Sequence, residues 1–426
     1  MSEDLADDDT DGGVTTVDER PRGSIYTREF WLIFAATFAL NSANNLFILF
    51  PLFIVKLGGG ASTIGAVVAT GSLAALLMRP LASRAIDRYG CRLTALSSVA
   101  LDCIFVTLYT TVHSLGGTLY LVRALHGAVD GTARVALFAL VYEVLPRERQ
   151  GEAMATFSLS GMVPAAFGAL LGEAIMRRWG FRVFFCAAGI LCAAALFAVM
   201  NLSRDEPRAL AKARAETAAN GLPSYWLLLT MAPLMMLWIV TLLFGLTNAV
   251  RTSFVAPFAY QRGIHTVGVY FTIFAAVAVL VRLSGRMMDR IGLERMLAPS
   301  FLVLAAGIAL VAGTGHTGVL EIAAVLGGLG HGFAYPAMTA LIIRHTPEGA
   351  TGRSSAIYTS VWDLSAMLGP YLLGLTAHHF GYPPMFLVAG GLGVIAAICL
   401  LASPSEVPLL AAMAEAGGDA LTDRPE

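Results

Sequence analysis

The sequence predicts an all-α integral membrane protein with twelve transmembrane helices in two six-helix pseudo-repeats. The first observation is composition, since 57% of the 426 residues are hydrophobic and only 13% are charged, against about 25% charged residues in soluble domains. The second is that the apolar residues form runs of helix length, the ~20 residues that cross a ~30 Å hydrocarbon core. The third is a charged motif that occurs once in each part of the chain.

Twelve apolar runs define the predicted helices. The first six lie near 29–56, 62–83, 93–113, 118–143, 151–176 and 181–202, and form an N-terminal half, 29–202. The last six lie near 225–259, 266–287, 295–313, 317–344, 351–377 and 383–403, and form a C-terminal half, 225–403. A charged linker, 203–224, separates the halves. Residues 1–28 are expected to be a disordered acidic tail and 404–426 a second tail.

The loop charges predict the orientation. With the N-terminus inside, fifteen Lys or Arg residues fall in inner loops and five in outer loops. Positive residues are retained on the cytoplasmic side. We therefore expect both termini, the linker and both tails in the cytoplasm, and a multi-pass protein of the cytoplasmic (inner) membrane of a prokaryote, surrounded by the lipid bilayer.

Composition and motifs argue against other functions. The 28 basic and 29 acidic residues nearly balance, so no nucleic-acid partner is expected. The five cysteines are scattered without metal-ligand or disulfide spacing, so no metal is expected. An integral membrane enzyme is the rival class, but HExxH, GxSxG and GxxxxGK[ST] do not occur. The last motif would mark a built-in ATP motor.

The charged motif recurs at an offset of 202 residues, between the second and third run of each half. Its two copies are Arg84, Asp87, Arg88 and Gly90, and Arg286, Asp289, Arg290 and Gly292. A carboxylate such as Asp87 can pair with arginines and with a helix N-terminus in one conformation and release them in another, so we expect a gating loop. The alternative is that the arginines only set topology.

Several segments resemble the major facilitator superfamily over residues 29–403. Residues 83–92 look like its signature between helices 2 and 3. Residues 123–127 look like its helix 4 motif, with His126 in the glutamine position, while 330–336 and 363–370 are similar to helices 10 and 11 of its bacterial multidrug-efflux-like branch. The resemblance implies secondary transport of a small-molecule substrate by alternating access, through a cavity lined by helices 1, 4, 7 and 10. A proton gradient, not a cofactor, would supply the energy, and we expect a monomer.

Ionisable residues inside the runs are candidates for function, because a charge at the bilayer centre is costly. Asp130 lies near mid-depth in the fourth run, with Arg123 and Arg134 on the same helix face. Asp363 lies at a similar depth in the eleventh run. Either carboxyl group could exchange a proton during transport. The alternatives are a structural Asp130–Arg134 ion pair, and a packing role for Asp363 against helix 8 or 2.

Other polar residues are candidates for lining the substrate cavity. They are Asn41, Asn45, Arg123, His126, Arg134, Asn248, Arg251, His331 and Tyr335. The arginines favour a substrate with a carboxylate or a phosphate. Helix–helix hydrogen bonds for the amides, and packing roles for the histidines and Tyr335, are the alternatives. Asp102 is expected to be structural and Glu173 to lie at the membrane interface.

The best interpretation is proton-coupled efflux of an anionic or zwitterionic metabolite, metallophore or drug. An uptake permease or an uncoupled facilitator is the alternative within the same class.

Overall fold

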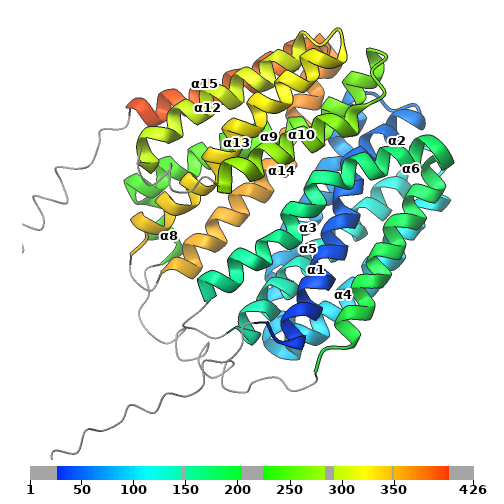
Figure 1. Ribbon diagram of the computed structural model, residues 1–426, viewed down its shortest axis with the longest axis vertical. Helices are drawn as coiled ribbons and strands as arrows, with labels where there is room; N and C mark the ends of the chain where they lie inside the picture. Colours follow the sequence, from blue (N-terminus) through cyan, green and yellow to red (C-terminus); the bar gives the residue numbers. More distant parts are fainter. Residues whose placement is uncertain (1–25, 146–149, 204–223, 284–291, 348–349, 403–426) are drawn as a thin grey trace, which may run out of the picture.

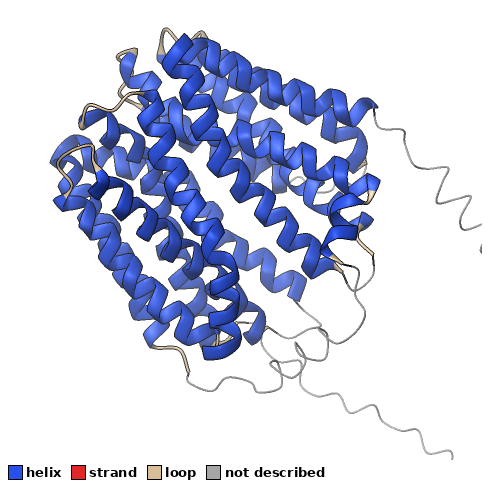
Figure 2. Cartoon of the chain, turned by 180° about the vertical axis from the view of Figure 1, so that it is seen from behind, coloured by secondary structure: helices blue, strands red, loops and turns tan. Residues whose placement is uncertain are grey.

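The computed structural model describes residues 26–145, 150–203, 224–283, 292–347 and 350–402, and within these ranges every regular element is helical (Figure 2). The first elements are α1 (Arg28–Leu46), η1 (Phe47–Leu49), α2 (Phe50–Lys56), α3 (Ala61–Tyr89), α4 (Cys91–Leu108), η2 (Tyr109–Thr111), α5 (Gly117–Val144) and α6 (Gln150–Met200). The later ones are α8 (Tyr225–Thr230), α9 (Ala232–Gln261), α10 (Val267–Leu283), α12 (Leu293–Ala312), α13 (Thr317–His345), α14 (Thr351–Phe380) and α15 (Tyr382–Ala402).

The helices form two bundles, which lie side by side in Figure 1. The N-terminal half, α1 to α6, is drawn in blue to green, and the C-terminal half, α8 to α15, in green to red. They meet mainly along two helix pairs, α3 with α14 and α6 with α10. We call the end at which α6 finishes and α8 begins the linker end, and the opposite end, between α2 and α3, the far end.

Every predicted run coincides with a helical segment, which confirms the all-α membrane fold. Nine helices in the described ranges are long and apolar enough to cross a membrane. The longest, α6, contains two of the predicted runs, which meet at the non-helical Gly180 (φ 79°, ψ 179°). The remaining two runs are α10, which is shorter than these helices, and α14, which contains more polar residues. That all twelve segments cross the bilayer stays a prediction.

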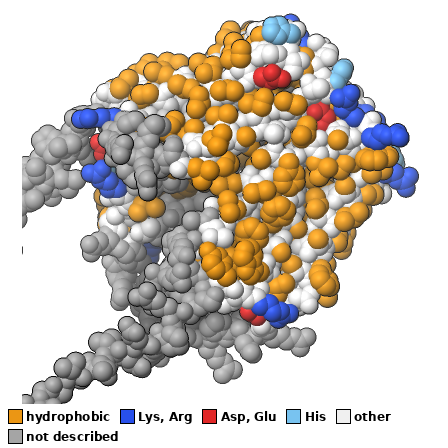
Figure 3. Space-filling model, viewed as in Figure 1, with side chains coloured by type: hydrophobic (Ala, Val, Ile, Leu, Met, Phe, Trp, Pro, Cys, Tyr) orange, Lys and Arg blue, Asp and Glu red, His pale blue; other side chains and the backbone are white. Residues whose placement is uncertain are grey.

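The surface fits a membrane environment. On the face shown in Figure 3, hydrophobic side chains cover the middle of the molecule, while charged side chains gather towards its ends. Large apolar side chains such as Ile190, Phe197 and Leu280 are exposed. Lipid chains can cover such side chains without an aqueous penalty, because the surrounding solvent is as apolar as the residues themselves.

Glycines with positive φ break the two halves at corresponding places. Gly90 (φ 84°) precedes α4, and Gly292 (φ 89°) precedes α12, at the offset predicted from the charged motif. Gly180 (φ 79°) and Gly381 (φ 85°) separate the last two helices of each half. A side chain with a Cβ atom would be strained at these positions. The repeat is therefore a repeat of backbone geometry as well as of charge.

The first charged motif is helical, which corrects the predicted loop. The helix α3 continues to Tyr89, and the exposed Arg84, Asp87 and Arg88 lie on its last two turns. The reason is that no residue before Gly90 interrupts the helical backbone.

Prolines explain two other breaks. Pro51 has no N–H to donate to the carbonyl of Phe47, and the 3₁₀ turn η1 begins at that residue. The seventh run was predicted as one helix, but it is divided at Met231, whose backbone is extended (ψ 122°). Pro233 then lies in the first turn of α9, where a missing N–H costs nothing.

The apolar cores differ between the two ends. At the far end one buried cluster combines both halves, with Phe50 and Phe185 from the first and Phe254 and Phe271 from the second. Towards the linker end, one cluster contains only N-terminal residues and another only C-terminal residues. Among the described residues, the halves thus share a core only at the far end.

Candidate functional site

Asp130 lies on α5 inside the N-terminal half and is 7% exposed. Its Oδ2 lies 2.5 Å from Nη2 of Arg134, one turn later, and its Oδ1 accepts a hydrogen bond from Asn44 on α1 (2.9 Å). The side chain of Arg134 is 46% exposed. The structure therefore contains the predicted Asp130–Arg134 pair. It adds Asn44, which is not among the predicted site residues.

Arg123 lies apart from this pair. Its guanidinium carbon is 5.1 Å from the centroid of the Phe50 ring. It packs beneath Gly71 of α3, where a Cβ would come within 2.5 Å of Nε of the arginine. Seven residues separate Arg123 from Asp130, which is about 10 Å along a helix, although both point to the same side. The three charged residues predicted to share one helix face are thus an ion pair and a separate arginine.

His126 lies inside the N-terminal half and not on an open cavity wall. It is 4% exposed, with Nε2 3.5 Å from Oδ1 of Asp102 and Nδ1 3.2 Å from the hydroxyl of Tyr109. The thiol of Cys192 lies 3.5 Å from Oδ2 of Asp102, to which it donates. The cluster corrects the predicted cavity-lining place of His126, because α1, α4 and α6 cover this face of α5. No group of acidic, His and Cys residues in the described ranges could hold a metal ion.

Asn41 and Asn45 lie where α1 packs against α6. The amide of Asn41 donates to the carbonyl of Ser160 (3.2 Å), and that of Asn45 donates to the carbonyl of Asn41 (2.8 Å). A Cβ on Gly168 of α6 would come within 2.4 Å of Asn45. Both amides are therefore bound within the N-terminal half: Asn41 forms the helix–helix hydrogen bond of the alternative, and Asn45 bonds within its own helix.

Asn248 and Arg251 lie together on α9, as predicted candidates of the C-terminal half. The Oδ1 of Asn248 accepts hydrogen bonds from Nε (3.3 Å) and Nη2 (2.8 Å) of Arg251. The guanidinium carbon of Arg251 is 4.0 Å from the ring centroid of Phe274 on α10. The amide and the ring together hold the guanidinium in one orientation.

His331 and Tyr335 on α13 continue this arrangement. The His331 ring lies 5.4 Å from Phe274 and 5.9 Å from Tyr335 between centroids. A second arginine, Arg282 of α10, lies over Tyr335 at 5.1 Å. Arg282 is not among the predicted site residues, although it lies within the apolar run 266–287. Its apolar neighbours in the chain could have marked it as part of a helix.

Neither Arg251 nor Arg282 has a carboxylate partner among the described residues. Nε of Arg282 and Nδ1 of His331 are also buried without a hydrogen-bond partner. Within the described residues, only aromatic faces and one amide offset these two positive charges. A half-buried positive site of this kind favours an anion.

Asp363 on α14 pairs with Arg79 on α3 and so joins the two halves. Nη1 of Arg79 also donates to the hydroxyl of Thr359, one turn before Asp363 (3.2 Å). The two charged side chains are 31% and 21% exposed. Sequence reasoning missed Arg79, although it is the single basic residue inside the second apolar run.

The charged motif is described only in part. In the first copy Asp87 is exposed and forms no ion pair within the described residues. In the second copy, Arg286, Asp289 and Arg290 lie outside the described residues. Its Gly292 lies inside them and precedes α12.

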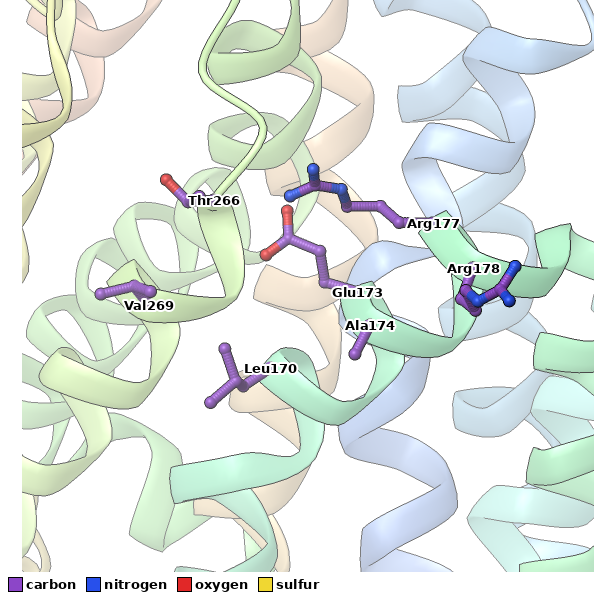
Figure 4. A pocket seen from close by; sticks show the side chains of 7 residues that line it. All are labelled: Leu170, Glu173, Ala174, Arg177, Arg178, Thr266 and Val269. Atoms are coloured by element: carbon purple, nitrogen blue, oxygen red, sulfur yellow. The ribbon is translucent and has the colours of Figure 1, made fainter.

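Glu173 joins the halves at the far end, which corrects its expected interfacial place. It is 4% exposed, and it accepts hydrogen bonds from the backbone N–H of Val267 (3.0 Å) and Gly268 (2.7 Å) and from the hydroxyl of Tyr260 (3.0 Å). The first two donors form the N-terminus of α10, where a negative charge is favoured. Beside it lies a pocket of about 410 Å³, whose walls come from α6 and the start of α10 (Figure 4).

Known proteins share this architecture. The family model of the Major Facilitator Superfamily matches residues 32–286 and 237–421. The chain is 26% identical to multidrug resistance protein MdtG of Serratia proteamaculans (strain 568) over 382 residues, which is 85% of this chain and 90% of that protein. It is 21% identical to the staphylopine export protein of Staphylococcus aureus (strain Mu50 / ATCC 700699) over 367 residues, 84% of this chain and 91% of that one.

Solved structures agree. A crystal structure of the nucleoside transporter NupG superimposes with a TM-score of 0.70 at 13% identity, over 88% of this chain and 99% of that chain. Because the family model covers most of the chain and the fold is that of its members, the chain belongs to the Major Facilitator Superfamily and is a membrane transporter, not an enzyme.

Proposed function

We propose that the protein is a secondary active transporter that exports a small organic solute across the cytoplasmic membrane by alternating access, coupled to proton entry. The solute is anionic or zwitterionic, such as a metabolite, a metallophore or a drug. The names of the relatives, which describe multidrug resistance and staphylopine export, support the outward direction.

The observation that carries this proposal is the difference between the two ends of the molecule. At the far end the halves share one apolar core, and towards the linker end their cores are separate. Separate cores allow the halves to part at the linker end without exposing a common core. With the termini in the cytoplasm, as the loop charges predict, this is the state that receives a solute from inside.

The two acids proposed to carry protons lie in different positions relative to the halves. Asp363 pairs with Arg79 of the other half, so its protonation removes an attraction between the halves. Asp130 pairs within its own helix, and its protonation releases the half-exposed Arg134. Either event changes the balance between conformations or the charge presented to the solute.

The solute site that we propose lies in the C-terminal half, around Asn248, Arg251, His331 and Tyr335. These four predicted residues are brought together, and they are half-buried. Arg123 and Arg134 are the further basic residues of the proposed cavity. Asn41, Asn45 and His126 are bound within the N-terminal half, so we assign them to packing there.

The test uses proteoliposomes of known protein orientation and the organic anion carboxyfluorescein as the probe. Export coupled to protons predicts that carboxyfluorescein accumulates on the far-end side when that side is acidic, and that nigericin abolishes the accumulation. Equilibration without accumulation would show an uncoupled facilitator. Accumulation on the linker-end side would show an uptake permease. Liposomes without protein, and liposomes with the Asp363→Asn variant, are the controls.

A further inference from the structure

Two arginines in the C-terminal half form a continuous row with three rings. Arg251 lies over Phe274, His331 lies between Phe274 and Tyr335, and Arg282 lies over Tyr335. The row is built from three helices, α9, α10 and α13. It is therefore a product of tertiary packing, and its members carry two positive charges that no described carboxylate neutralises.

The hydrogen bonds of Arg251 leave one edge of its guanidinium group free. Asn248 accepts from Nε and Nη2, which form one of the two edges that can hold a carboxylate. The edge formed by Nη1 and Nη2 has no partner among the described residues. Because Phe274 lies against the guanidinium, a carboxylate on the free edge would lie in the guanidinium plane.

Further aromatic rings adjoin His331 and Tyr335 of the row. The rings of Tyr335 and Trp362 are perpendicular (88°), with centroids 6.0 Å apart, and both residues are half-buried. Phe244 lies 5.4 Å from Trp362 and 5.2 Å from His331. Perpendicular rings can contact both the face and the edge of a flat aromatic ligand.

The helices that form the site also contact the other half. Of the helices that form it, α9 contacts α2, α10 contacts α6, and α14, which carries Trp362, contacts α3. The two arginines and His331 are half-buried, so the site is partly accessible. A ligand held here would touch helices that move when the halves rock.

We propose that the row of Arg251, Phe274, His331, Tyr335 and Arg282 binds a planar aromatic carboxylate. The carboxylate binds the free guanidinium edge of Arg251, with Arg282 as the second positive group, and the ring contacts Tyr335 and Trp362. This inference rests on the proposed function, because it names the solute class of the same transporter.

The test measures equilibrium binding to the purified full-length protein by isothermal titration calorimetry, without a gradient. The probe is 2-naphthoate, and its two controls are 2-naphthamide, which keeps the rings without the charge, and cyclohexanecarboxylate, which keeps the charge without an aromatic ring. We expect 2-naphthoate to bind at least about tenfold more tightly than either control. Equal affinity for the amide or for the alicyclic acid, or no binding of 2-naphthoate, would overturn the proposal.

Variants test the individual residues. Arg251→Gln and Arg282→Gln should each weaken 2-naphthoate binding by about tenfold or more. The matched control is Arg344→Gln, which removes an exposed arginine of the same half that pairs with Glu294, and it should bind as the wild type does. Tyr335→Leu should reduce the preference for 2-naphthoate over cyclohexanecarboxylate. If the glutamine variants do not fold, Arg251→Lys and Arg282→Lys are used instead. They keep the positive charge without the planar guanidinium group, and each should still weaken binding.

The two proposals can fail separately. Binding of 2-naphthoate with the expected variants, but no proton-driven movement of carboxyfluorescein, would leave the site in place and overturn the transport direction or coupling. Proton-driven export that is unchanged in both arginine variants would leave the function in place and overturn the site.

Discussion

Replacing Glu173 by glutamine should open the far end of the transporter. Glu173 is the acceptor through which α6 of one half binds the N-terminus of α10 and Tyr260 of the other. The glutamine side chain would keep one oxygen, but its NH₂ group would face the backbone N–H of Gly268 or Val267, where two donors cannot pair. The negative charge at the helix N-terminus is lost as well.

The size of the effect follows from these contacts. A hydrogen bond to a charged group contributes about 1.5–3 kcal/mol, so the loss of one such bond, with the weakening of the others, costs about 2–4 kcal/mol. At about 1.4 kcal/mol per factor of ten, the ratio of far-end-closed to far-end-open molecules falls by about 30- to 700-fold. A state that is rare in the wild type thus becomes readily populated.

The assay is labelling of a cysteine at Ala61 by a membrane-impermeant maleimide, in a background without the five native cysteines. Ala61 is 8% exposed, and its carbonyl lies 2.8 Å from the place of a Cβ on Gly374 of the other half, so the reagent reaches it only when the halves part. Glu173→Gln should raise the labelling rate at least about tenfold.

The matched control is Glu321→Gln. Glu321 lies near the far end of α13, and no hydrogen bond or ion pair is described for it, so the same chemical change leaves the contact between the halves intact. Its labelling rate should equal that of the parent protein. Equal rates in the Glu173→Gln and Glu321→Gln variants would refute the idea that Glu173 holds the far end closed.

Three further predictions concern the other charged groups. Asp130→Asn should abolish accumulation driven by a pH gradient and spare exchange at equal pH, measured as proteoliposome flux; full gradient-driven transport would assign coupling elsewhere. Arg79→Asp and Asp363→Arg should each impair transport. The double variant should restore part of it, because opposite charges would again face each other across the halves. A double variant no better than either single one would contradict the pairing. Asp87→Asn should leave the amount of inserted protein unchanged and lower turnover, and normal turnover would reduce the charged motif to a topology signal.

Much of the architecture could be predicted from local properties of the chain. In a bilayer each spanning segment must satisfy its own backbone hydrogen bonds, so a run of apolar residues of sufficient length is enough to indicate a helix. Gly90 and Gly292 were predicted as a repeated pair from their spacing, and both have a positive φ directly before the helix that follows. Pro51 and Pro233 explain the breaks that the runs alone did not show.

The partners of the polar residues could not be predicted in the same way. Hydropathy shows that a residue lies in the membrane, but which side chain it meets depends on how helices cross and rotate against each other. Asp363 and Arg79 are 284 residues apart. Glu173 meets the start of α10, and His126 points to Asp102 on α4 instead of an open cavity.

The sequence by itself therefore determined the membrane class, the order of the helices and the repeat, because these depend on composition and short-range backbone geometry. Only the tertiary structure brings Arg251 and Arg282 together around His331, where neither arginine has a carboxylate partner among the described residues. It also decided that Asn41 and Asn45 bind within their own half. The physical reason is that a charge or an amide in a membrane is satisfied by whichever group packing brings within reach, and packing joins residues that are far apart in the chain.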